Sequence, residues 1–455
     1  MQHGVGLFRV DLVAAVPCFE VGRMVRFQHV LISLDGRFSF IPSHQKSFKT
    51  IPKCFFTDSL QVWNKSCNIA TDFKMIVRMK TLFKFHIIQL GCQSNEADAF
   101  GIISCLLAHG CSITDSIEDS DVIIVMTCGF ASKRYNNSID CIKKVNRIKR
   151  SDAEIWIGGC IPAINANLAK ELPFEVGLVF APRDFEQKIE EYLDCHLDFS
   201  KINSNDETIE SVPVRIINGC SENCTYCVIK CAGGTSRSKP MGQIINLILA
   251  LNRNVKTIKL VGEEVGAYGK DLGVSLLDLV QRILDIRPDV TISFSAIHPK
   301  YFIQDYEMYV ELFNIKNISR ILPIPVQSGS NSVLKAMNRG YTIENVMGSV
   351  KSFLKVHPDV EISTDIMVGF PTESWDDFLL SKSLVEELPL AALECFKYDD
   401  MKGVGDCVDE SEKKKRLEII ALTFIRRFCI EHNITNLTAL DDFIKGNKIP
   451  INVNI

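Results

Sequence analysis

The hydrophobic pattern between residues 79 and 195 predicts strands and helices that alternate. Strands are expected at 79–90, 122–126 and 155–157, and the second is an uninterrupted apolar run, which is typical of a parallel strand buried on both faces. Helices are expected at 95–109 and 138–148, where apolar residues recur on one face. This alternation predicts an open α/β domain.

A second series of strands follows a polar stretch at 196–212, which is interpreted as a linker. Six short apolar runs are the expected strands, and they lie at 214–217, 257–261, 291–295, 321–325, 362–368 and 393–398. Helices are expected between them, and a last helix is expected at about 410–433. Six such units predict a partial (βα)6 barrel of parallel strands, whose reactive ends are the carboxyl ends of the strands. The expected fold class is therefore α/β throughout.

The expected domain organisation has five parts. Residues 1–78 form an extension of unknown role that carries no motif and is expected to be dispensable for the fold, with Met79 a candidate initiator. They are followed by the open α/β domain at 79–195, the linker at 196–212, the barrel at 213–433, and a short tail at 434–455.

Composition narrows the classes of function. The 455 residues include 51 basic and 55 acidic side chains, so no global positive field attracts nucleic acid, and any such contact must come from local patches. No secretory leader and no apolar run of about 18 residues is evident, which favours a cytoplasmic protein without a membrane partner. Seventeen cysteines is a high number, and in a reducing compartment clustered cysteines are more often metal ligands or catalytic groups than disulfides.

The sharpest motif has the spacing C-x3-C-x2-C, formed by Cys220, Cys224 and Cys227 after the first barrel strand. Three thiolates this close can hold three irons of a [4Fe–4S] cluster and leave the fourth iron open to a cofactor. The alternatives are a zinc site or buried apolar cysteines. Zinc usually requires a second pair of Cys or His ligands, which the neighbouring sequence does not supply.

A second set of cysteines is dispersed along the first domain. Cys92, Cys128 and Cys160 each follow a predicted strand, and each has a glycine beside it. The loops at the carboxyl ends of neighbouring parallel strands meet in one crevice, so these thiols are expected to converge on a second cluster. The alternative is three separately buried cysteines, since free cysteine is often buried.

With these motifs in place, the chain from about 82 to 433 resembles the radical S-adenosylmethionine methylthiotransferases, which include the tRNA and ribosomal-protein methylthiotransferases. The resemblance rests on ordered strings along the chain: LGCQSNEAD at 90–98, VIIVMTCGF at 122–130, GGC at 158–160, GCSENCTYC at 219–227, VGEEVGAYG at 261–269, IPVQSGS at 324–330, MNRGYT at 337–342 and TDIMVGFPTE at 364–373. It implies two [4Fe–4S] clusters, one on each cysteine triplet, and S-adenosylmethionine as cofactor.

The resemblance also implies how the chemistry is divided. The triplet Cys220, Cys224 and Cys227 is expected to be catalytic, forming the radical that abstracts hydrogen from an unreactive C–H, and the amino-terminal cluster is expected to carry sulfur. The implied substrate is a hypermodified adenosine next to the tRNA anticodon. A ribosomal-protein side chain, or a peptide or small molecule, is the alternative substrate, and a non-catalytic metal-stabilised protein is a further alternative. An electron donor such as flavodoxin or ferredoxin and a source of sulfur are implied partners.

Cofactor contacts are expected after several barrel strands. Glu263 is a candidate acceptor for the ammonium of the cofactor, with a helix-capping acid as the alternative. Arg339 is a candidate partner for its carboxylate, with a surface arginine in a turn as the alternative. The other expected contacts are Tyr226, Gly262, Gln327, Ser328 and Asp365.

Three features depart from the family pattern. The residues after 433 are too few for the carboxy-terminal RNA-binding barrel, called TRAM, that members usually carry. Lys230 stands where proline is usual, and Pro323 stands where histidine is common. The segment 132–150 is locally basic, and its positive side chains are interpreted either as a solvated helix face or as a patch that contacts phosphate. These departures leave the cluster motifs intact and weaken the substrate assignment.

Overall fold

The computed structural model describes residues 82–195, 209–405 and 407–431, and also the backbones of strands β1 (Leu7–Val10), β2 (His29–Ser33), β3 (Phe38–Ile41) and β16 (Asn452–Asn454). The predictions for the extension at 1–78, for most of the linker and for the tail at 434–455 otherwise lie outside the described residues. None of the helices in the described ranges is long and apolar enough to cross a membrane.

The first domain is a parallel five-stranded sheet in the order β5-β4-β6-β7-β8. Its central strands are those predicted from the sequence: β4 (Lys84–Gln89), β6 (Val122–Thr127) and β7 (Glu154–Gly159). Every residue of β6 is buried, as its apolar run predicted. The edge strands β5 (Ser112–Ile113) and β8 (Leu178–Val179) were not predicted, because two residues are too few to form a pattern.

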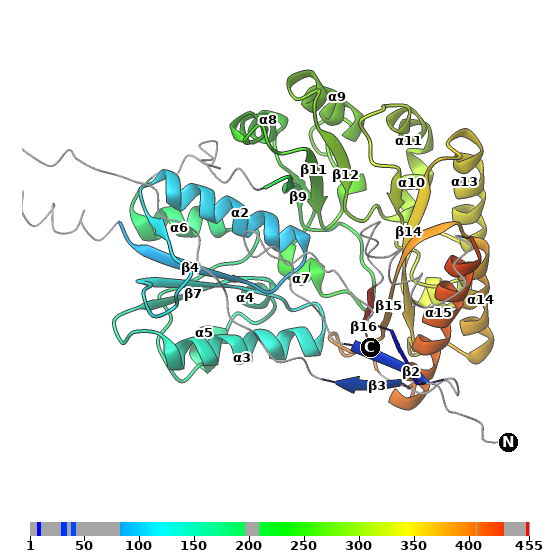
Figure 1. Cartoon of the computed structure of the whole chain (residues 1–455), viewed down its shortest axis with the longest axis horizontal. Coiled ribbons are helices and arrows are strands. Elements are labelled where there is room, and N and C mark those ends of the chain that lie inside the picture. The colour runs from blue at the N-terminus through cyan, green and yellow to red at the C-terminus, as the bar shows by residue number, and fades with distance from the viewer. Residues whose placement is uncertain are drawn as a thin grey trace, which may run out of the picture.

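Helices cover both faces of this sheet (Figure 1). One face carries α2 (Gln93–Ala108) and α6 (Phe185–Leu193), and the other carries α3 (Ser132–Ile148) with the short helices α4 (Cys160–Ile164) and α5 (Leu168–Glu171). Each layer has its own core: Ile102 and Leu106 of α2 pack with Phe185 on one side, and Ile142 and Val145 of α3 pack on the other. The open α/β domain is therefore confirmed.

All six predicted barrel strands are present. They are β9 (Ser211–Asn218), β11 (Thr257–Gly262), β12 (Thr291–Phe294), β13 (Ile321–Pro323), β14 (Glu361–Val368) and β15 (Leu390–Lys397). Neighbouring strands pair in parallel within two sheets, and an isolated parallel bridge joins Ile292 of β12 to Ile318, which precedes β13. β13 is shorter than predicted because Pro325 has no N–H with which to continue the ladder.

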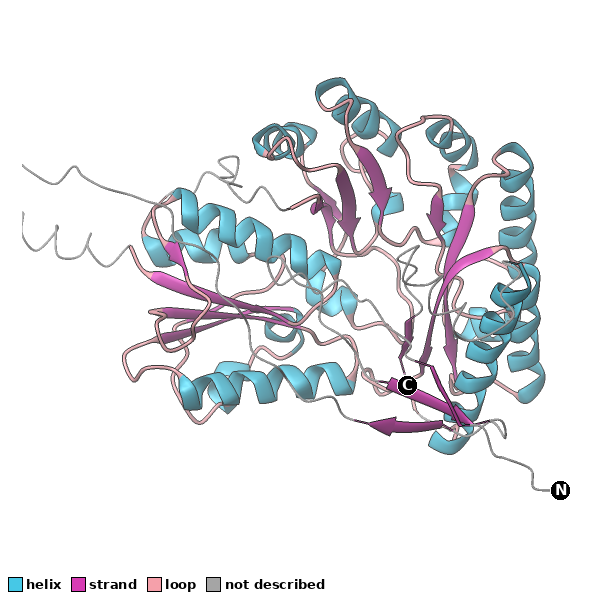
Figure 2. Ribbon diagram, in the orientation of Figure 1, coloured by secondary structure: helices cyan, strands magenta, loops and turns pink. Residues whose placement is uncertain are grey.

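Helices lie on the outside of these strands (Figure 2). The connections contain η2 (Val265–Ala267) and the short β10 (Arg237–Ser238); the helices are α7 (Ile229–Gly233), α8 (Met241–Ala250), α9 (Leu276–Ile286), α10 (Pro299–Gln304), α11 (Tyr306–Phe313), α12 (Asn331–Ala336), α13 (Ile343–Val356), α14 (Trp375–Glu387) and α15 (Glu410–Glu431). Capping boxes start α9 and α14, where Ser275 and Ser374 exchange hydrogen bonds with the acids at the third helical position.

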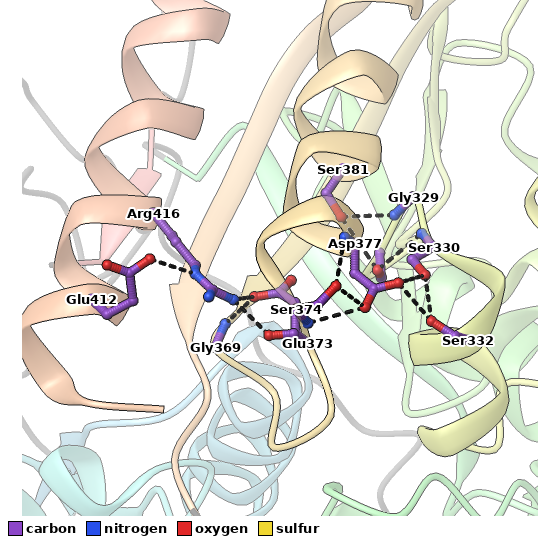
Figure 3. A network of polar contacts seen from close by, with 11 residues as sticks. Gly329, Ser330, Ser332, Gly369, Glu373, Ser374, Asp377, Ser381, Glu412 and Arg416 are labelled. Carbon is purple, nitrogen blue, oxygen red and sulfur yellow. Dashed lines mark hydrogen bonds and ion pairs between the residues drawn. The ribbon is translucent and has the colours of Figure 1, made fainter. Parts of the chain in front are cut away.

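A polar network ties the loops after β13 and β14 to two of these helices (Figure 3). Arg416 of α15 donates to the Glu373 carboxylate at 2.7 Å, and the same carboxylate accepts the Gly369 N–H. Asp377 of α14 accepts the hydroxyls of Ser330 and Ser332. The loop after β13, which carries the expected contacts Gln327 and Ser328, and the loop that follows β14 are therefore both held by helices on the outside of the barrel.

Candidate iron–sulfur and cofactor site

The three amino-terminal cysteines lie at one edge of the first sheet, as predicted. Cys92 occupies the N-cap position of α2 after β4, Cys128 follows β6, and Cys160 begins α4 directly after β7. Because β4, β6 and β7 are parallel neighbours, their carboxyl ends emerge side by side. Gly159 has a φ of 91°, and a Cβ there would lie 2.3 Å from the Thr127 carbonyl oxygen, so the turn into Cys160 requires glycine.

Side-chain hydrogen bonds hold these three loops against one another. Asn95, on the first turn after Cys92, donates to the Thr127 carbonyl at 3.0 Å. The Thr127 hydroxyl donates to the Gly158 carbonyl at 2.7 Å and accepts the Ile161 N–H at 3.3 Å. One chain of bonds thus passes from the Cys92 loop through the Cys128 loop to the Cys160 loop.

Burial and the neighbouring thiols both act on Cys160. Burial raises the pKa of the Cys160 thiol well above its ordinary value, and the negative potential of Cys92 and then Cys128 raises it further. A bound cation would reverse this effect, because it favours the thiolate. In the described ranges no group of three His, Cys, Asp or Glu residues is compact enough for a single metal ion. A cluster of several irons suits a wider set of thiols better than one ion does.

The carboxyl-terminal triplet lies on the loop between β9 and α7. Gly219 has a φ of 73°, and a Cβ there would lie 2.5 Å from the Thr235 carbonyl oxygen. Glu264 then supports the first cysteine: it accepts the Ser221 N–H at 3.1 Å and the Cys220 thiol at 3.5 Å. The side of the loop near Thr225 bonds to the end of α12, where the Met337 carbonyl accepts the Thr225 N–H.

Three predicted ligands line one cavity. Cys220, Cys224 and Cys227 share it with Glu222, Asn223, Lys230 and Lys402. Burial raises the pKa of Cys227 to about 11 and raises that of Cys220 still further, so a cation in the cavity is needed to hold these groups as thiolates. Three soft donors without a fourth cysteine or a histidine among the lining residues fit a [4Fe–4S] cluster with one open iron.

Arg339 lies behind Cys224 and is buried, so it is not the surface arginine of the alternative interpretation. Its Nη1 atom donates to the Cys224 sulfur at 3.4 Å and to the Tyr226 hydroxyl at 3.3 Å. Its Nη2 atom donates to the Pro325 carbonyl, and its Nε atom donates to the Tyr341 hydroxyl. The guanidinium therefore donates hydrogen bonds to protein groups around the cysteine loop. Its expected contact with a cofactor carboxylate remains a prediction.

Glu263 is also committed to protein partners. Its two carboxylate oxygens accept Nη1 of Arg215 at 2.7 and 2.8 Å, and Oε2 also accepts the Gly219 N–H at 3.0 Å. Among the described helices it caps none, in contrast to the alternative interpretation. Gly262 precedes it, at a point where a Cβ would lie 2.4 Å from the Ile217 side chain of β9. Whether Glu263 also meets the cofactor ammonium remains a prediction.

The other expected cofactor residues differ in whether their polar atoms already have hydrogen-bond partners in the protein. Gln327 is buried in the left-handed region with a φ of 75°, and among the described residues its Oε1 atom has no hydrogen-bond partner. An orphaned buried acceptor of this kind fits a site for a polar ligand. Ser328, by contrast, shares a hydrogen bond with Ser381 of α14 at 3.3 Å.

Asp365 lies beside Glu394 in the register of β14 and β15. Burial raises the pKa of Asp365 to about 8, and repulsion by Glu394 contributes while Arg339 opposes it. A buried carboxyl group that is neutral at pH 7 becomes an effective counter-ion only when a cation arrives. This behaviour is compatible with the expected contact to a positively charged cofactor.

Sequence reasoning missed two features of the site. His298, at the start of α10, has its pKa lowered to about 2 by burial and by the positive charges of Arg339 and Lys300, and its Nε2 atom is buried without a partner among the described residues. Arg215 joins Glu263 to Asp98 of the first domain. Its only sequence signal is a charge inside the otherwise apolar strand VPVRII.

Comparisons with known proteins cover both domains. Residues 214–384 match the Radical SAM superfamily, and residues 84–181 match the Uncharacterized protein family UPF0004. A tRNA-2-methylthio-N(6)-dimethylallyladenosine synthase of Thermosipho melanesiensis is 33% identical over 366 residues, which span 74% of this chain and 82% of that protein. The synthase of the same description from Sulfurihydrogenibium sp. is 28% identical over 341 residues, or 70% and 77% of the two chains.

A solved structure shares the fold. A radical S-adenosylmethionine methyltransferase from Kitasatospora setae superposes with a TM-score of 0.51 at 11% identity, covering 69% of this chain and 72% of that one. At this identity the likeness concerns the arrangement of the elements. It agrees with an α/β domain followed by a barrel of parallel strands.

Proposed function

The chain belongs to the radical S-adenosylmethionine methylthiotransferase family, and from this premise we propose that it inserts a methylthio group into an adenosine of tRNA. The enzyme class follows from the family, as do S-adenosylmethionine and two [4Fe–4S] clusters as its cofactors. The proposal concerns the substrate, which is a hypermodified adenosine next to the anticodon. Such a base is unstacked in a loop and can enter a pocket.

One observation carries the proposal: two cysteine triplets lie on strand-end loops of two domains that meet. The helix that begins at Cys160, α4, lies against α7, the helix that follows Cys227 (Figure 1). When bound, the clusters and S-adenosylmethionine supply the reductive cleavage of a sulfonium and a transferable sulfur. A methylthiotransferase needs both functions near one substrate.

The chain itself supplies ligands, orientation and exclusion of water. Cys92, Cys128 and Cys160 would hold one cluster, and Cys220, Cys224 and Cys227 would hold the other. Gln327 offers a free buried acceptor, and Asp365 can become a buried counter-ion. Tyr226, Gly262, Glu263, Ser328 and Arg339 remain proposed contacts around the same loops.

The relatives support tRNA as substrate, since their names state it. Exposed cations on α3, among them Lys143, Lys144 and Arg147, offer a surface for phosphate. The other proposed partners are a low-potential electron donor, such as flavodoxin or ferredoxin, and a source of sulfur. The proposed location of the protein is the cytoplasm.

Nucleoside analysis tests the substrate. In a strain that lacks its own tRNA methylthiotransferase, expression of this chain should restore the methylthio form of the modified adenosine in digested tRNA. A matched strain that expresses the Cys92→Ala, Cys128→Ala, Cys160→Ala variant should keep only the precursor base. Unmethylthiolated tRNA with the active chain, together with a mass increase on a ribosomal protein, would move the assignment to the alternative substrate.

A further inference from the structure

A buried ionic bridge crosses between the two domains. Arg215, on β9, donates from Nε and Nη2 to the two Asp98 oxygens at 2.6 and 2.8 Å, and from Nη1 to both Glu263 oxygens. The Arg215 side chain is 3% exposed and the Asp98 side chain is 2% exposed. One guanidinium thus holds a carboxylate of each domain, with a two-nitrogen fork on Asp98 and a single nitrogen shared between the two Glu263 oxygens.

Each of the two carboxylates lies on or bonds to a segment that carries one cysteine triplet. Asp98 lies on α2, and Cys92 is the N-cap residue of that helix. Glu263 accepts the Gly219 N–H, and Gly219 directly precedes Cys220. The bridge therefore connects the helix that carries one ligand to the turn that carries another.

A buried ion pair is a weak source of stability but a strong source of specificity in position. Apolar residues of similar volume often stabilise a contact equally well, since two charges must be taken out of water to form the pair. An apolar contact can slide, whereas a guanidinium fork bonded to two carboxylates on opposite sides has a single good arrangement. A bridge at this place would keep the separation between the two cysteine triplets fixed.

Two hydrogen-bonded contacts between the domains are more exposed. Lys239 pairs with Glu186 of α6 at 3.2 Å, and its side chain is 23% exposed. The exposed Ser132, at the start of α3, donates its hydroxyl to Asp399 at 2.8 Å. Water can replace these contacts at little cost, so they constrain the interface less than Arg215 does.

We infer that Arg215 is a positioning residue, which fixes the distance between the two cysteine triplets so that sulfur from one reaches the substrate activated at the other. The inference rests on the proposed function, because only a reaction that uses both clusters needs that distance fixed. Arg215 itself is not expected to touch substrate or cofactor.

The test compares Arg215→Met with two controls in the full chain after anaerobic reconstitution. Lys239→Met removes an exposed ion pair between the domains, and Arg287→Met removes a buried arginine that bonds only within the barrel, to Asp289 and Val255. The first readout is the magnetic dipolar interaction between the two reduced clusters, which reports their separation without any substrate. The second is methylthio product per S-adenosylmethionine cleaved.

For Arg215→Met we expect a broader distribution of cluster separations and a fall of roughly 10- to 100-fold in product per cofactor cleaved, with cofactor cleavage itself retained. Both controls should keep the wild-type values. If Arg215→Met does not fold, Asp98→Asn weakens the same bridge and should show the same pattern. An unchanged separation overturns the inference, even if product falls. If the wild type methylthiolates nothing, the proposed function fails while the dipolar measurement still decides the role of the bridge.

Discussion

At the scale of single residues, Asp365 makes stability depend on pH. Its carboxyl group has a pKa of about 8 in the folded chain and an ordinary value near 3.8 when unfolded. Between these values the folded state keeps a proton that the unfolded state releases, so the free energy of unfolding falls as pH rises from about 4 to 8. Replacing the Asp365 carboxyl group by one that does not titrate should remove this decrease in the free energy of unfolding.

We therefore predict that Asp365→Asn gains stability relative to the wild type as pH rises from 5 to 8. The measurement is the denaturant midpoint at several pH values, made anaerobically without added S-adenosylmethionine. Asp376→Asn is the control, since Asp376 is exposed on the first turn of α14. Parallel curves for wild type and Asp365→Asn would show that this carboxyl group is ionised in the folded protein at pH 5 already.

Arg339 should tune the potential of the carboxyl-terminal cluster. Its N–H donates to the Cys224 sulfur, and a cationic donor stabilises the more negative, reduced cluster. Arg339→Leu should lower the midpoint potential of that cluster by tens of millivolts, on a scale where about 59 mV is tenfold for a one-electron couple. Potentiometric titration followed by EPR measures it, and the amino-terminal cluster is the internal control. An unchanged or higher potential of the carboxyl-terminal cluster would contradict this account.

At the scale of elements, α3 is an amphipathic helix with a basic outer face. Ile142 and Val145 are buried against the sheet, whereas Lys143, Lys144 and Arg147 are exposed. Arg150, which follows the helix, is engaged by Asp121 at 2.7 Å and by Asp152 at 3.0 Å. The free positive surface is therefore smaller than the sequence indicated, and it is centred on Lys143 and Lys144.

Reversing Lys143 and Lys144 to Glu should weaken binding of tRNA and flatten its salt dependence. The slope of log affinity against log salt should fall by roughly 0.7–0.9 for every phosphate that a lysine no longer neutralises. The matched control reverses Lys351 and Lys355, two exposed lysines of α13 on the outside of the barrel. Filter binding across a salt series gives the slopes. Equal slopes for both double variants would mean that α3 presents only a solvated face.

Elements with a strong local pattern could be predicted, and those without one could not. β6 was predicted because parallel strands buried on two faces are apolar throughout. The beginning of α3 was placed six residues late, because Ser132 to Asn137 are polar and the helical periodicity starts only at Ile139. β5 and β8 exist through pairing with their neighbours, which no local pattern records.

At the scale of the whole molecule, the cysteines of the site could be predicted but their connections could not. Cysteine positions after successive strands follow from topology, because parallel strands bring their carboxyl ends together. The bridge through Arg215 joins residues 117 positions apart, and such pairing depends on how two domains dock. His298 was missed for the same reason, since the burial of its Nε2 atom without a partner among the described residues is a property of the assembled fold.

The two triplets lie on different domains, so we predict that their clusters load independently. The reconstituted chain should hold about eight irons, and changing Cys220, Cys224 and Cys227 together to Ala should leave about four. Iron analysis and Mössbauer spectra measure both states. The variant should lose cleavage of S-adenosylmethionine, whereas the Cys92, Cys128 and Cys160 variant should keep it. Loss of all iron from either variant, or zinc in the native protein, would contradict independent loading.

The Arg215 bridge also limits how such a chain can be recombined. Asp98 comes from one half of the molecule, while Arg215 and Glu263 come from the other. A chimaera that joins this barrel to the first domain of a relative without an acid at the position of Asp98 would bury a guanidinium with one carboxylate missing. The halves are therefore interchangeable only in sets that match at this point, and an exchange that restores the acid should recover a functional junction.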